Sequence, residues 1–259
     1  MKALTALFFA SALAASWLVP PPPEAAADGA PKVLWSKLYD QDNAVFEVEV
    51  LAAAGDGGML VAGFSHPRGN RDLSDIRIMK LDRNGKIEFD RTVDESPYDY
   101  VKFADVTSDG GYLVGGFTSK PRGGNLKSIL AGRRDALAIK LDRSGGVSWV
   151  KTYGGPGEDM ASGVFERPGG GYLLVGTSGS VETGLGCGTA RGRTSVWAAK
   201  LDRNGDFADG ACAERGRQAD WASAAGTPGG AIALVNSSAG GGRDAPYSVR
   251  IGADLSFGP

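Results

Sequence analysis

Histidine and cysteine, the residues on which most zinc sites and nucleophilic enzymes depend, are almost missing from this sequence. It contains one histidine, His66, and two cysteines among 259 residues. No serine or cysteine near His66 is placed to suggest a catalytic triad, so an exposed loop residue is expected there. The two cysteines lie far from His66 in the sequence, which argues against a shared metal site. The sequence therefore offers no nucleophile–base pair, and an enzyme is not the leading expectation.

A basic excess is missing as well. Lys and Arg number 28 against 30 Asp and Glu, so the formal net charge is −2. Nucleic-acid-binding domains normally carry a clear positive excess, because each phosphate contact needs a cation. We therefore expect no nucleic-acid partner. Glycine, in contrast, is abundant: its 40 residues recur beside short apolar runs, which is typical of turns between strands.

Long hydrophobic runs are absent except at the N-terminus. Met1-Lys2 is followed by an apolar run from Ala3 to Val19, then by Pro20–Pro23 and by Ala25-Ala26-Ala27. A positive start, an apolar segment and an A-x-A site make up a secretory signal peptide. We predict that residues 1–27 are removed, which leaves residues 28–259 in the periplasm or outside the cell. A retained anchor is the alternative, but the run is shorter than the ~20 residues of a spanning helix, so no stable membrane span is expected after cleavage.

The strongest positive signal is internal repetition. The segment KLDRNG at Lys80 returns as KLDRSG at Lys140 and as KLDRNG at Lys200, sixty residues apart each time. A glycine-led apolar run precedes each copy, and a fourth run lies nearer the C-terminus. These runs begin at Gly58, Gly111, Gly171 and Gly230. A third marker follows two of the turns, as IEFDRTV at Ile87 and VSWVKTY at Val147, and VLWSKLY at Val33 echoes it.

Each unit predicts four short strands joined by tight Asp/Gly turns. Even spacing of such strands is compatible with a sandwich, a barrel or a propeller. The sixty-residue recurrence favours the propeller, whose blades bury only the faces that meet their neighbours. We expect an all-β fold, a small β-propeller of about four four-stranded blades. Its units are residues 47–93, 99–153, 159–210 and 220–257, the last completed by residues 33–39.

The chain ends predict how the ring closes. The fourth unit has little room for a fourth strand, so Val33–Tyr39 is expected to pair beside its third strand, Tyr247–Ile251, and to close the ring. Leu255-Ser256-Phe257 also resembles the start of a fourth strand. If that segment fills the place, Val33–Tyr39 is spare, and the ring is incomplete or pairs with a second copy.

These markers resemble the repeats of bacterial and archaeal β-propeller proteins, whose units read D-x-A-x-x-V, D-G-G-Y-L-V-G, K-L-D-x-x-G and W-x-K-T-Y-G-G. The match is closest over Trp149–Gly155, Asp159–Val164 and Gly170–Gly176, and it decays in the fourth unit. The resemblance implies a secreted or surface propeller. It brings no common activity and no catalytic residues, so none are assigned.

One face of the predicted propeller carries the long loops. Connections between second and third strands, and between blades, emerge on this face, whereas tight turns emerge on the other. Long irregular loops on a rigid scaffold are where binding usually occurs. The basic residues expected to contact a ligand are Arg68, Arg122, Lys127, Arg133 and Arg134. An anionic glycan or an acidic protein surface would suit them; the alternative is solvated charge that keeps the loops soluble.

Four acidic residues are predicted to start the innermost strands: Glu47, Asp99, Asp159 and Asp220. In a closed ring they would surround the mouth of the channel, where converging carboxylates could hold Ca²⁺. The favoured alternative is that each carboxylate bonds loop backbone within its own blade. No other cofactor is expected.

Cys187 and Cys212 are predicted to form a disulfide, because two cysteines in one small exported domain usually pair. Two free thiols are the alternative, since the sequence does not establish their separation.

The leading functional hypothesis is an exported, non-catalytic binding module for a protein or an anionic glycan. One alternative is a secreted polysaccharide lyase or hydrolase that uses the channel-mouth carboxylates. Another is a structural component of the cell envelope.

Overall fold

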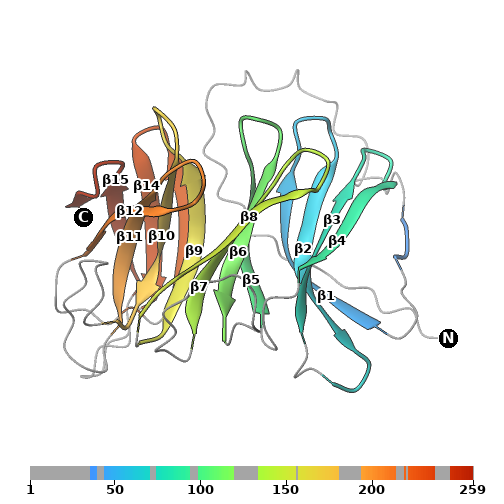
Figure 1. Ribbon diagram of the computed structural model, residues 1–259, viewed down its shortest axis with the longest axis horizontal. Coiled ribbons are helices and arrows are strands. Elements are labelled where there is room, and N and C mark those ends of the chain that lie inside the picture. Colours follow the sequence, from blue (N-terminus) through green and yellow to red (C-terminus); the bar gives the residue numbers. More distant parts are fainter. Residues whose placement is uncertain are drawn as a thin grey trace, which may run out of the picture. The chain divides into compact units, whose positions relative to one another are not determined.

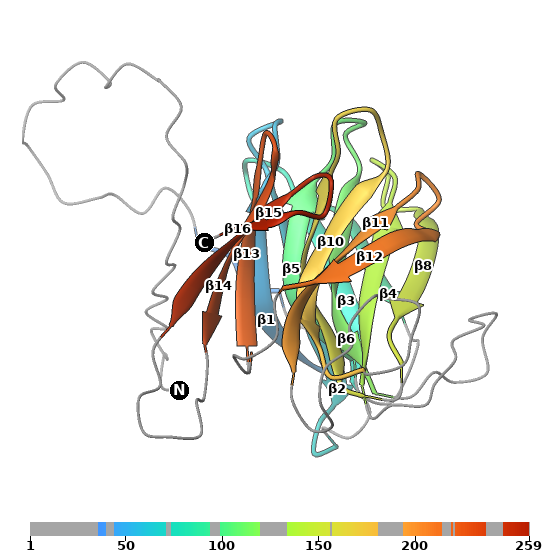
Figure 2. The same ribbon diagram turned by 90° about the vertical axis from the view of Figure 1, so that its left-hand side faces the viewer.

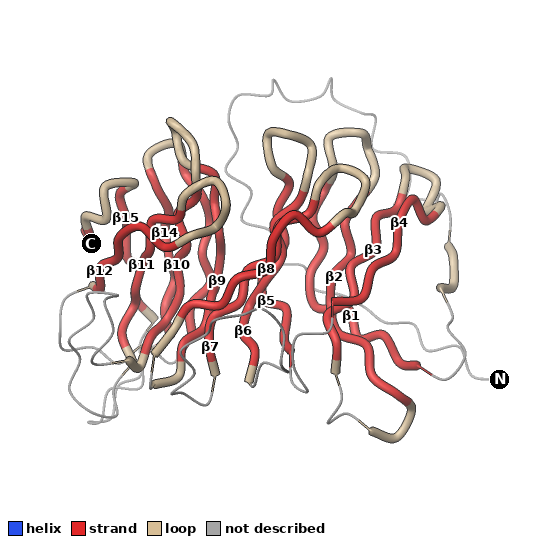
Figure 3. The backbone as a smooth tube through the Cα atoms, in the orientation of Figure 1, coloured by secondary structure: helices blue, strands red, loops and turns tan. Residues whose placement is uncertain are grey.

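The computed structural model describes residues 36–39, 44–70, 74–93, 99–119, 134–155, 157–180, 194–213, 219, 221–236 and 246–258. All of the strands belong to one compact unit, Lys37–Pro259. Over the described ranges no helix is long and apolar enough to cross a membrane, and Figure 3 shows strands and loops only.

Within the described ranges, sixteen strands form four antiparallel sheets of four strands each, and every sheet uses four consecutive strands (Figure 1). The first contains β1 (Ala44–Ala53), β2 (Met59–Pro67), β3 (Asp75–Leu81) and β4 (Ile87–Val93). The second contains β5 (Asp99–Val106), β6 (Tyr112–Thr118), β7 (Asp135–Leu141) and β8 (Val147–Tyr153). The third contains β9 (Asp159–Glu166), β10 (Tyr172–Ser178), β11 (Ser195–Leu201) and β12 (Phe207–Cys212). The fourth contains β13 (Trp221–Thr227), β14 (Gly230–Asn236), β15 (Tyr247–Gly252) and β16 (Phe257–Gly258). The expectation of an all-β fold with four four-stranded units is confirmed.

Neighbouring sheets pack face to face, and one apolar cluster fills each of the three interfaces. In Figure 2 the molecule is viewed from the end at which the fourth sheet lies. In β10, Leu174 belongs to the cluster with the second sheet, whereas Leu173 belongs to the cluster with the fourth. Successive side chains on a strand point to opposite faces. A strand that is buried on both faces therefore needs a continuous apolar run, which the second strands β2, β6 and β10 have.

The lysine that begins each KLD segment pairs with the aspartate of the preceding Asp-Gly-Gly turn in the first two sheets. Lys140 in β7 is 5% exposed, and its Nζ donates to Asp109 in the turn between β5 and β6, 3.0 Å from Oδ2. Lys80 makes the same contact with Asp56 in the first sheet, at 2.7 Å. A Cβ on Gly111 would lie 2.3 Å from the Leu141 carbonyl oxygen and 2.4 Å from Lys140 Nζ. The Leu141 carbonyl and the buried lysine together leave no room for a side chain at this position, and the equivalent carbonyl of Leu201 excludes one at Gly171.

The third unit departs from this pattern. Gly169 stands in its turn where Asp56 and Asp109 stand in the first two. Lys200 therefore lacks the repeated partner, and its side chain is 21% exposed. It donates instead to the Asp254 carbonyl oxygen of the fourth sheet, at 3.2 Å.

The aromatic marker at the end of the second unit links that sheet to the third. Trp149 packs over Gly205, whose Cβ would lie 3.0 Å from the indole ring. Tyr153 donates its hydroxyl hydrogen to the Gly205 carbonyl oxygen at 2.7 Å. Tyr39 makes the same kind of contact with Gly85 of the first sheet, at 2.6 Å.

Strand β16 corrects the predicted closure. It pairs beside β15, through Ile251 with Phe257, and so takes the place expected for Val33–Tyr39. The turn before it is tight because Asp254 Oδ1 accepts hydrogen bonds from the Ser256 backbone NH and hydroxyl, and Leu255 adopts φ of 72°. The closing strand is therefore wrongly predicted: its described part, residues 36–39, forms no strand. Among the described strands, no contact as extensive as those between successive sheets joins the fourth sheet to the first.

Candidate functional site

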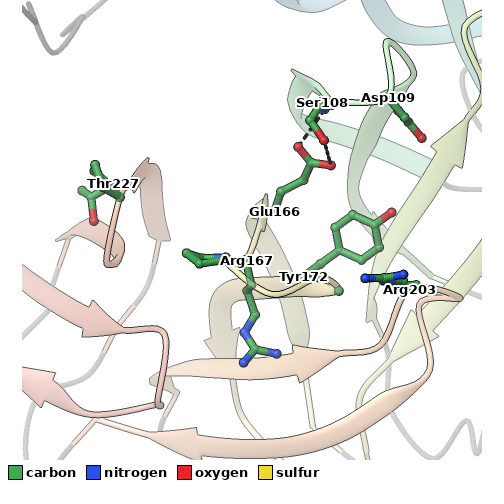
Figure 4. A pocket seen from close by; sticks show the side chains of 11 residues that line it. Ser108, Asp109, Glu166, Arg167, Tyr172, Arg203 and Thr227 are labelled. Carbon is green, nitrogen blue, oxygen red and sulfur yellow. Dashed lines mark hydrogen bonds between the residues drawn. The ribbon is translucent and has the colours of Figure 1, made fainter.

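A groove of about 600 Å³ opens where the turns of the second, third and fourth sheets meet (Figure 4). Its walls are the turn after β5, the turn after β9, the turn after β11 and the turn after β13. The groove lies on the face where the sequence predicts tight turns alone. Sequence reasoning missed it because a groove between turns depends on how three sheets pack.

The acidic side chains in the groove are already engaged. Glu166 accepts hydrogen bonds from the backbone NH of Ser108 at 2.7 Å and from its hydroxyl at 3.0 Å, which ties the third sheet to the second. Asp109 accepts from Thr107 and from Lys140. The hydrogen bond from the Thr107 hydroxyl, with those from the Gly111 backbone and Lys140, lowers the pKa of Asp109 to about 2. Both carboxylates are therefore held by hydrogen bonds within the protein itself.

The basic side chains in the groove are not engaged in this way. Arg167 and Arg203 line it, and neither donates a side-chain hydrogen bond to any of the residues that the structure describes. The Nε of Arg167 is buried and has no partner in that part of the chain. Figure 4 shows both guanidinium groups on the side away from the Glu166–Ser108 contact, with Arg203 beside Tyr172.

The arginines equivalent to Arg203 donate hydrogen bonds to their turns in the first two units. Arg83 and Arg143 occupy the position of Arg203 in the first two repeats. Their Nη2 atoms donate to the backbone carbonyls of Asp56 and Asp109, at 3.0 and 3.2 Å. In the third unit the turn is Gly169-Gly170-Gly171, and a Cβ on Gly170 would lie 2.6 Å from Arg203 Nε. Arg203 thus lies against its own turn, but no hydrogen bond joins its guanidinium to the backbone of that turn or to any other residue that the structure describes.

This arrangement supplies hydrogen-bond donors and positive charge beside an aromatic ring. A guanidinium group presents a planar set of donors that matches a carboxylate or sulfate through two parallel hydrogen bonds. Tyr172 packs edge-on against Trp149 with ring centroids 5.7 Å apart, so its ring is fixed as one wall. The groove is suited to hold an anionic group.

Most of the basic loop residues predicted as the binding surface lie outside the described residues: Arg122, Lys127 and Arg133. Arg68 is exposed in the turn after β2. Arg134 has a structural contact: its guanidinium lies over the Phe117 ring at 5.1 Å and 3.8 Å from a Glu158 oxygen. Its carbonyl accepts from the Asp159 backbone NH at 2.9 Å, so this residue joins the second sheet to the third.

The four acids predicted to surround a channel do not share one position. Asp99 pairs across the sheet with Thr118 and Asp159 with Ser178, each at the first residue of its strand. Glu47 lies one register position further along, opposite Phe64. A shift of one residue turns a side chain to the other face of the strand, so the predicted equivalence of Glu47 is wrong. Asp220 lies outside the described residues.

His66 also corrects the sequence-based expectation. It lies inside β2 with 5% exposure and is not an exposed loop residue. Its Nε2 lies 3.1 Å from Glu47 Oε1 and its Nδ1 lies 3.0 Å from the Pro67 carbonyl oxygen. This pair joins β1 to β2. In the described ranges, no group of three His, Cys, Asp or Glu side chains is placed to hold a metal ion.

Asp159 instead meets a residue that sequence reasoning missed, Asp135 at the start of β7. Asp135 is 2% exposed and Asp159 is fully buried. Asp135 Oδ1 and Asp159 Oδ2 lie 2.4 and 2.8 Å from one point, the position that a Cβ on Gly154 would take. Asp159 Oδ2 accepts from the Gly155 backbone NH at 2.9 Å and from the Ser180 hydroxyl at 2.6 Å. Burial, with the negative charge of Asp159, raises the pKa of Asp135 to about 7.

The predicted disulfide involves Cys187, which lies outside the described residues. Cys212 ends β12 opposite Trp197 and packs against the apolar cluster between the second and third sheets. The pairing stays a prediction.

Comparison with known proteins finds structural likeness without sequence kinship. No protein-family model and no curated protein matches the chain. A Bacteroides caccae protein of unknown function is 11% identical, with a TM-score of 0.41 over 85% of this chain and 65% of that one. A variant of Synechocystis apocarotenoid oxygenase is 12% identical, with a TM-score of 0.45 over 82% of this chain and 50% of that one. The chain thus spans less than two thirds of either protein, and no activity transfers from them.

Proposed function

We propose that this chain is an exported, non-catalytic binding module of the bacterial propeller-repeat type, and that its groove binds an anionic ligand on a glycan or a protein. One observation carries the proposal: two arginines line the groove without a partner in the described part of the chain, while the acids beside them are engaged.

The chain provides an internal comparison for this assignment. Arg83 and Arg143 each donate a hydrogen bond to a carbonyl of their own turn, whereas Arg203 donates none to the residues that the structure describes. A guanidinium left without a carboxylate or carbonyl partner gains most from an incoming anion, because hydrogen bonds to charged groups contribute about 1.5–3 kcal/mol each. A carboxylated or sulfated ligand is therefore the expected class.

Export supports a ligand outside the cytoplasm. The positive start, the apolar run and the A-x-A site over residues 1–27 predict secretion to the periplasm or the outside of the cell. The balanced charge of the chain supports a compact anionic group as the ligand over a nucleic acid.

The test compares Arg203→Ala with Arg143→Ala, its counterpart in the second unit. Carboxylated and sulfated glycans are screened on an array, and the affinity of the best ligand is then measured at increasing salt. We expect Arg203→Ala and Arg167→Ala to weaken binding about tenfold or more each, and Arg143→Ala to leave it unchanged. Affinity of the unaltered chain should fall with salt.

Two outcomes would contradict the proposal. Equal binding by Arg203→Ala and the unaltered chain would exclude the groove. If replacement of Arg122, Arg133 and Arg134 abolished binding while the groove variants bound normally, the ligand would belong to the long-loop face.

A further inference from the structure

The carboxylate pair of Asp135 and Asp159 is separate from the groove. Strand β9 begins at Asp159 and ends at Glu166, so the pair and the groove lie at opposite ends of the same strand. The pair also crosses an interface, because Asp135 belongs to the second sheet and Asp159 to the third. The proposed anion site makes no use of it.

Several oxygens at this pair lack partners. Asp135 Oδ1 and Asp159 Oδ1 are buried, and neither accepts a hydrogen bond from any residue that the structure describes. The hydroxyl of Thr118, which is fully buried and lies directly opposite Asp135 across the sheet, is likewise without a partner in the described ranges. Residues directly opposite each other project from the same side of a sheet. Unpaired buried polar atoms are uncommon in folded proteins and point to a missing partner.

The missing side chain of Gly154 lets the two carboxylates come close to each other. A Cβ at this position would collide with Asp135 Oδ1 at 2.4 Å and with Asp159 Oδ2 at 2.8 Å. Both oxygens therefore face the same small volume beside the glycine. Two buried carboxylates in this arrangement repel each other unless a proton or a cation lies between them.

We propose that Asp135, Asp159 and the Thr118 hydroxyl bind one Ca²⁺ ion that joins the second sheet to the third. The donors are all oxygen atoms, which hard cations prefer, and Ca²⁺ accepts irregular sets of six to eight oxygens at about 2.3–2.6 Å. Mg²⁺ demands near-ideal octahedral geometry and gives up its water reluctantly, so it suits this buried pair less well. With two carboxylates, the affinity belongs to the range of extracellular calcium modules, about 0.1–1 mM.

The experiment measures calcium binding by the purified chain and by three variants. Isothermal titration gives the stoichiometry, and thermal unfolding in EDTA, in CaCl₂ and in MgCl₂ at matched ionic strength gives the stabilisation. Asp135→Asn removes one charge of the pair, and Thr118→Val removes the hydroxyl but keeps both carboxylates. Glu49→Gln is the control, since it removes one negative charge from an exposed position of β1.

The expected result separates a cation site from a structural pair. The unaltered chain and Glu49→Gln bind one Ca²⁺ each, and their unfolding temperatures rise by several degrees in about 5 mM calcium, more than in magnesium. Asp135→Asn is at least as stable as the unaltered chain in EDTA, because the repulsion is gone, but calcium does not stabilise it. Thr118→Val folds and binds calcium more weakly.

Either of two results would overturn the proposal. The first is an unaltered chain that shows no calcium binding at about 10 mM, well above the affinity range of such modules; the pair would then hold a shared proton only. The second is an Asp135→Asn or Thr118→Val variant that binds calcium as tightly as the unaltered chain.

Discussion

In the repeated ion pair, loss of the exposed aspartate should cost more stability than loss of the buried lysine, because it leaves the lysine charge buried and unpaired. Lys140 is 5% exposed at its side chain, whereas Asp109 is 62% exposed. Asp109→Asn removes the negative charge but keeps an amide oxygen that can accept from the Gly111 backbone NH, as the carboxylate does at 2.8 Å. The ammonium of Lys140 would then stay buried with the Leu141 carbonyl, 2.9 Å away, as its main partner.

The size of the stability loss follows from how exposed the Lys140 and Asp109 side chains are. Removing one partner of a fully buried ion pair costs about 3–5 kcal/mol, because the other charge remains unpaired. Asp109 is mostly solvated, so solvent screening reduces that cost, and we expect about 2 kcal/mol. For a chain of this size, that loss lowers the unfolding temperature by roughly 4–8 °C. Lys140→Met removes the buried charge and leaves only an exposed carboxylate, so its cost should stay below about 1 kcal/mol.

The assay is urea unfolding of both single variants and the double variant at neutral pH, followed by tryptophan fluorescence. The double variant should recover most of the stability that Asp109→Asn loses, because no charge is left buried. An Asp109→Asn variant as stable as the unaltered chain would refute this reasoning, and so would a Lys140→Met variant of equal or greater cost. The third unit already lacks this ion pair: Gly169 stands in the place of the aspartate, and the lysine, Lys200, is more exposed than Lys140.

Three further predictions follow from other contacts. Gly111→Ala should destabilise the chain by about 1–3 kcal/mol, because its Cβ would lie 2.3 Å from the Leu141 carbonyl oxygen; a neutral result in urea unfolding would contradict that geometry. Tyr153→Phe should lower the free energy of unfolding by about 1 kcal/mol, since it removes the buried hydrogen bond to Gly205. Equal unfolding midpoints would show that this bond does not stabilise the chain. In EDTA, stability should fall as pH rises from about 4 to 7, because the raised pKa of Asp135 makes the folded state bind more protons than the unfolded state in that window; a slope as steep in Asp135→Asn would assign it to other groups.

The sheets were predictable because their signals are local and repeated. Each Asp/Gly turn carries its own chemistry: Asp142 Oδ1 accepts from the backbone NH groups of Ser144 and Gly146, and Gly145 supplies a φ of 80°. The first three apolar runs specify strands buried on both faces, whereas the fourth, in β14, alternates between buried and exposed residues. Repetition of these features at a fixed interval was enough to predict four units and their strand order.

The site was less predictable because it depends on register and on contacts between sheets. Counting from sequence markers placed Glu47 one position away from the true counterpart of Asp99 and Asp159, which is Phe46 opposite Ser65. Asp135 starts a third strand, where no motif marks it, and it meets Asp159 only once two sheets are packed. The glycine at position 169 was a visible departure from the repeat. That Arg203 makes no hydrogen bond to its turn, unlike Arg83 and Arg143, is visible only in the structure.

The use of four consecutive strands for every sheet bears on how the chain reaches its native state. No sheet waits for a strand from a distant part of the sequence, so each can complete its hydrogen bonding once its own segment is available. Proteins whose contacts are close in sequence fold faster than those that must first close long loops. A chain emerging gradually from the ribosome can therefore fold sheet by sheet, each finished sheet acting as the template on which the next one docks. The most vulnerable moment would be the interval in which the latest sheet still shows an uncovered apolar face to its surroundings.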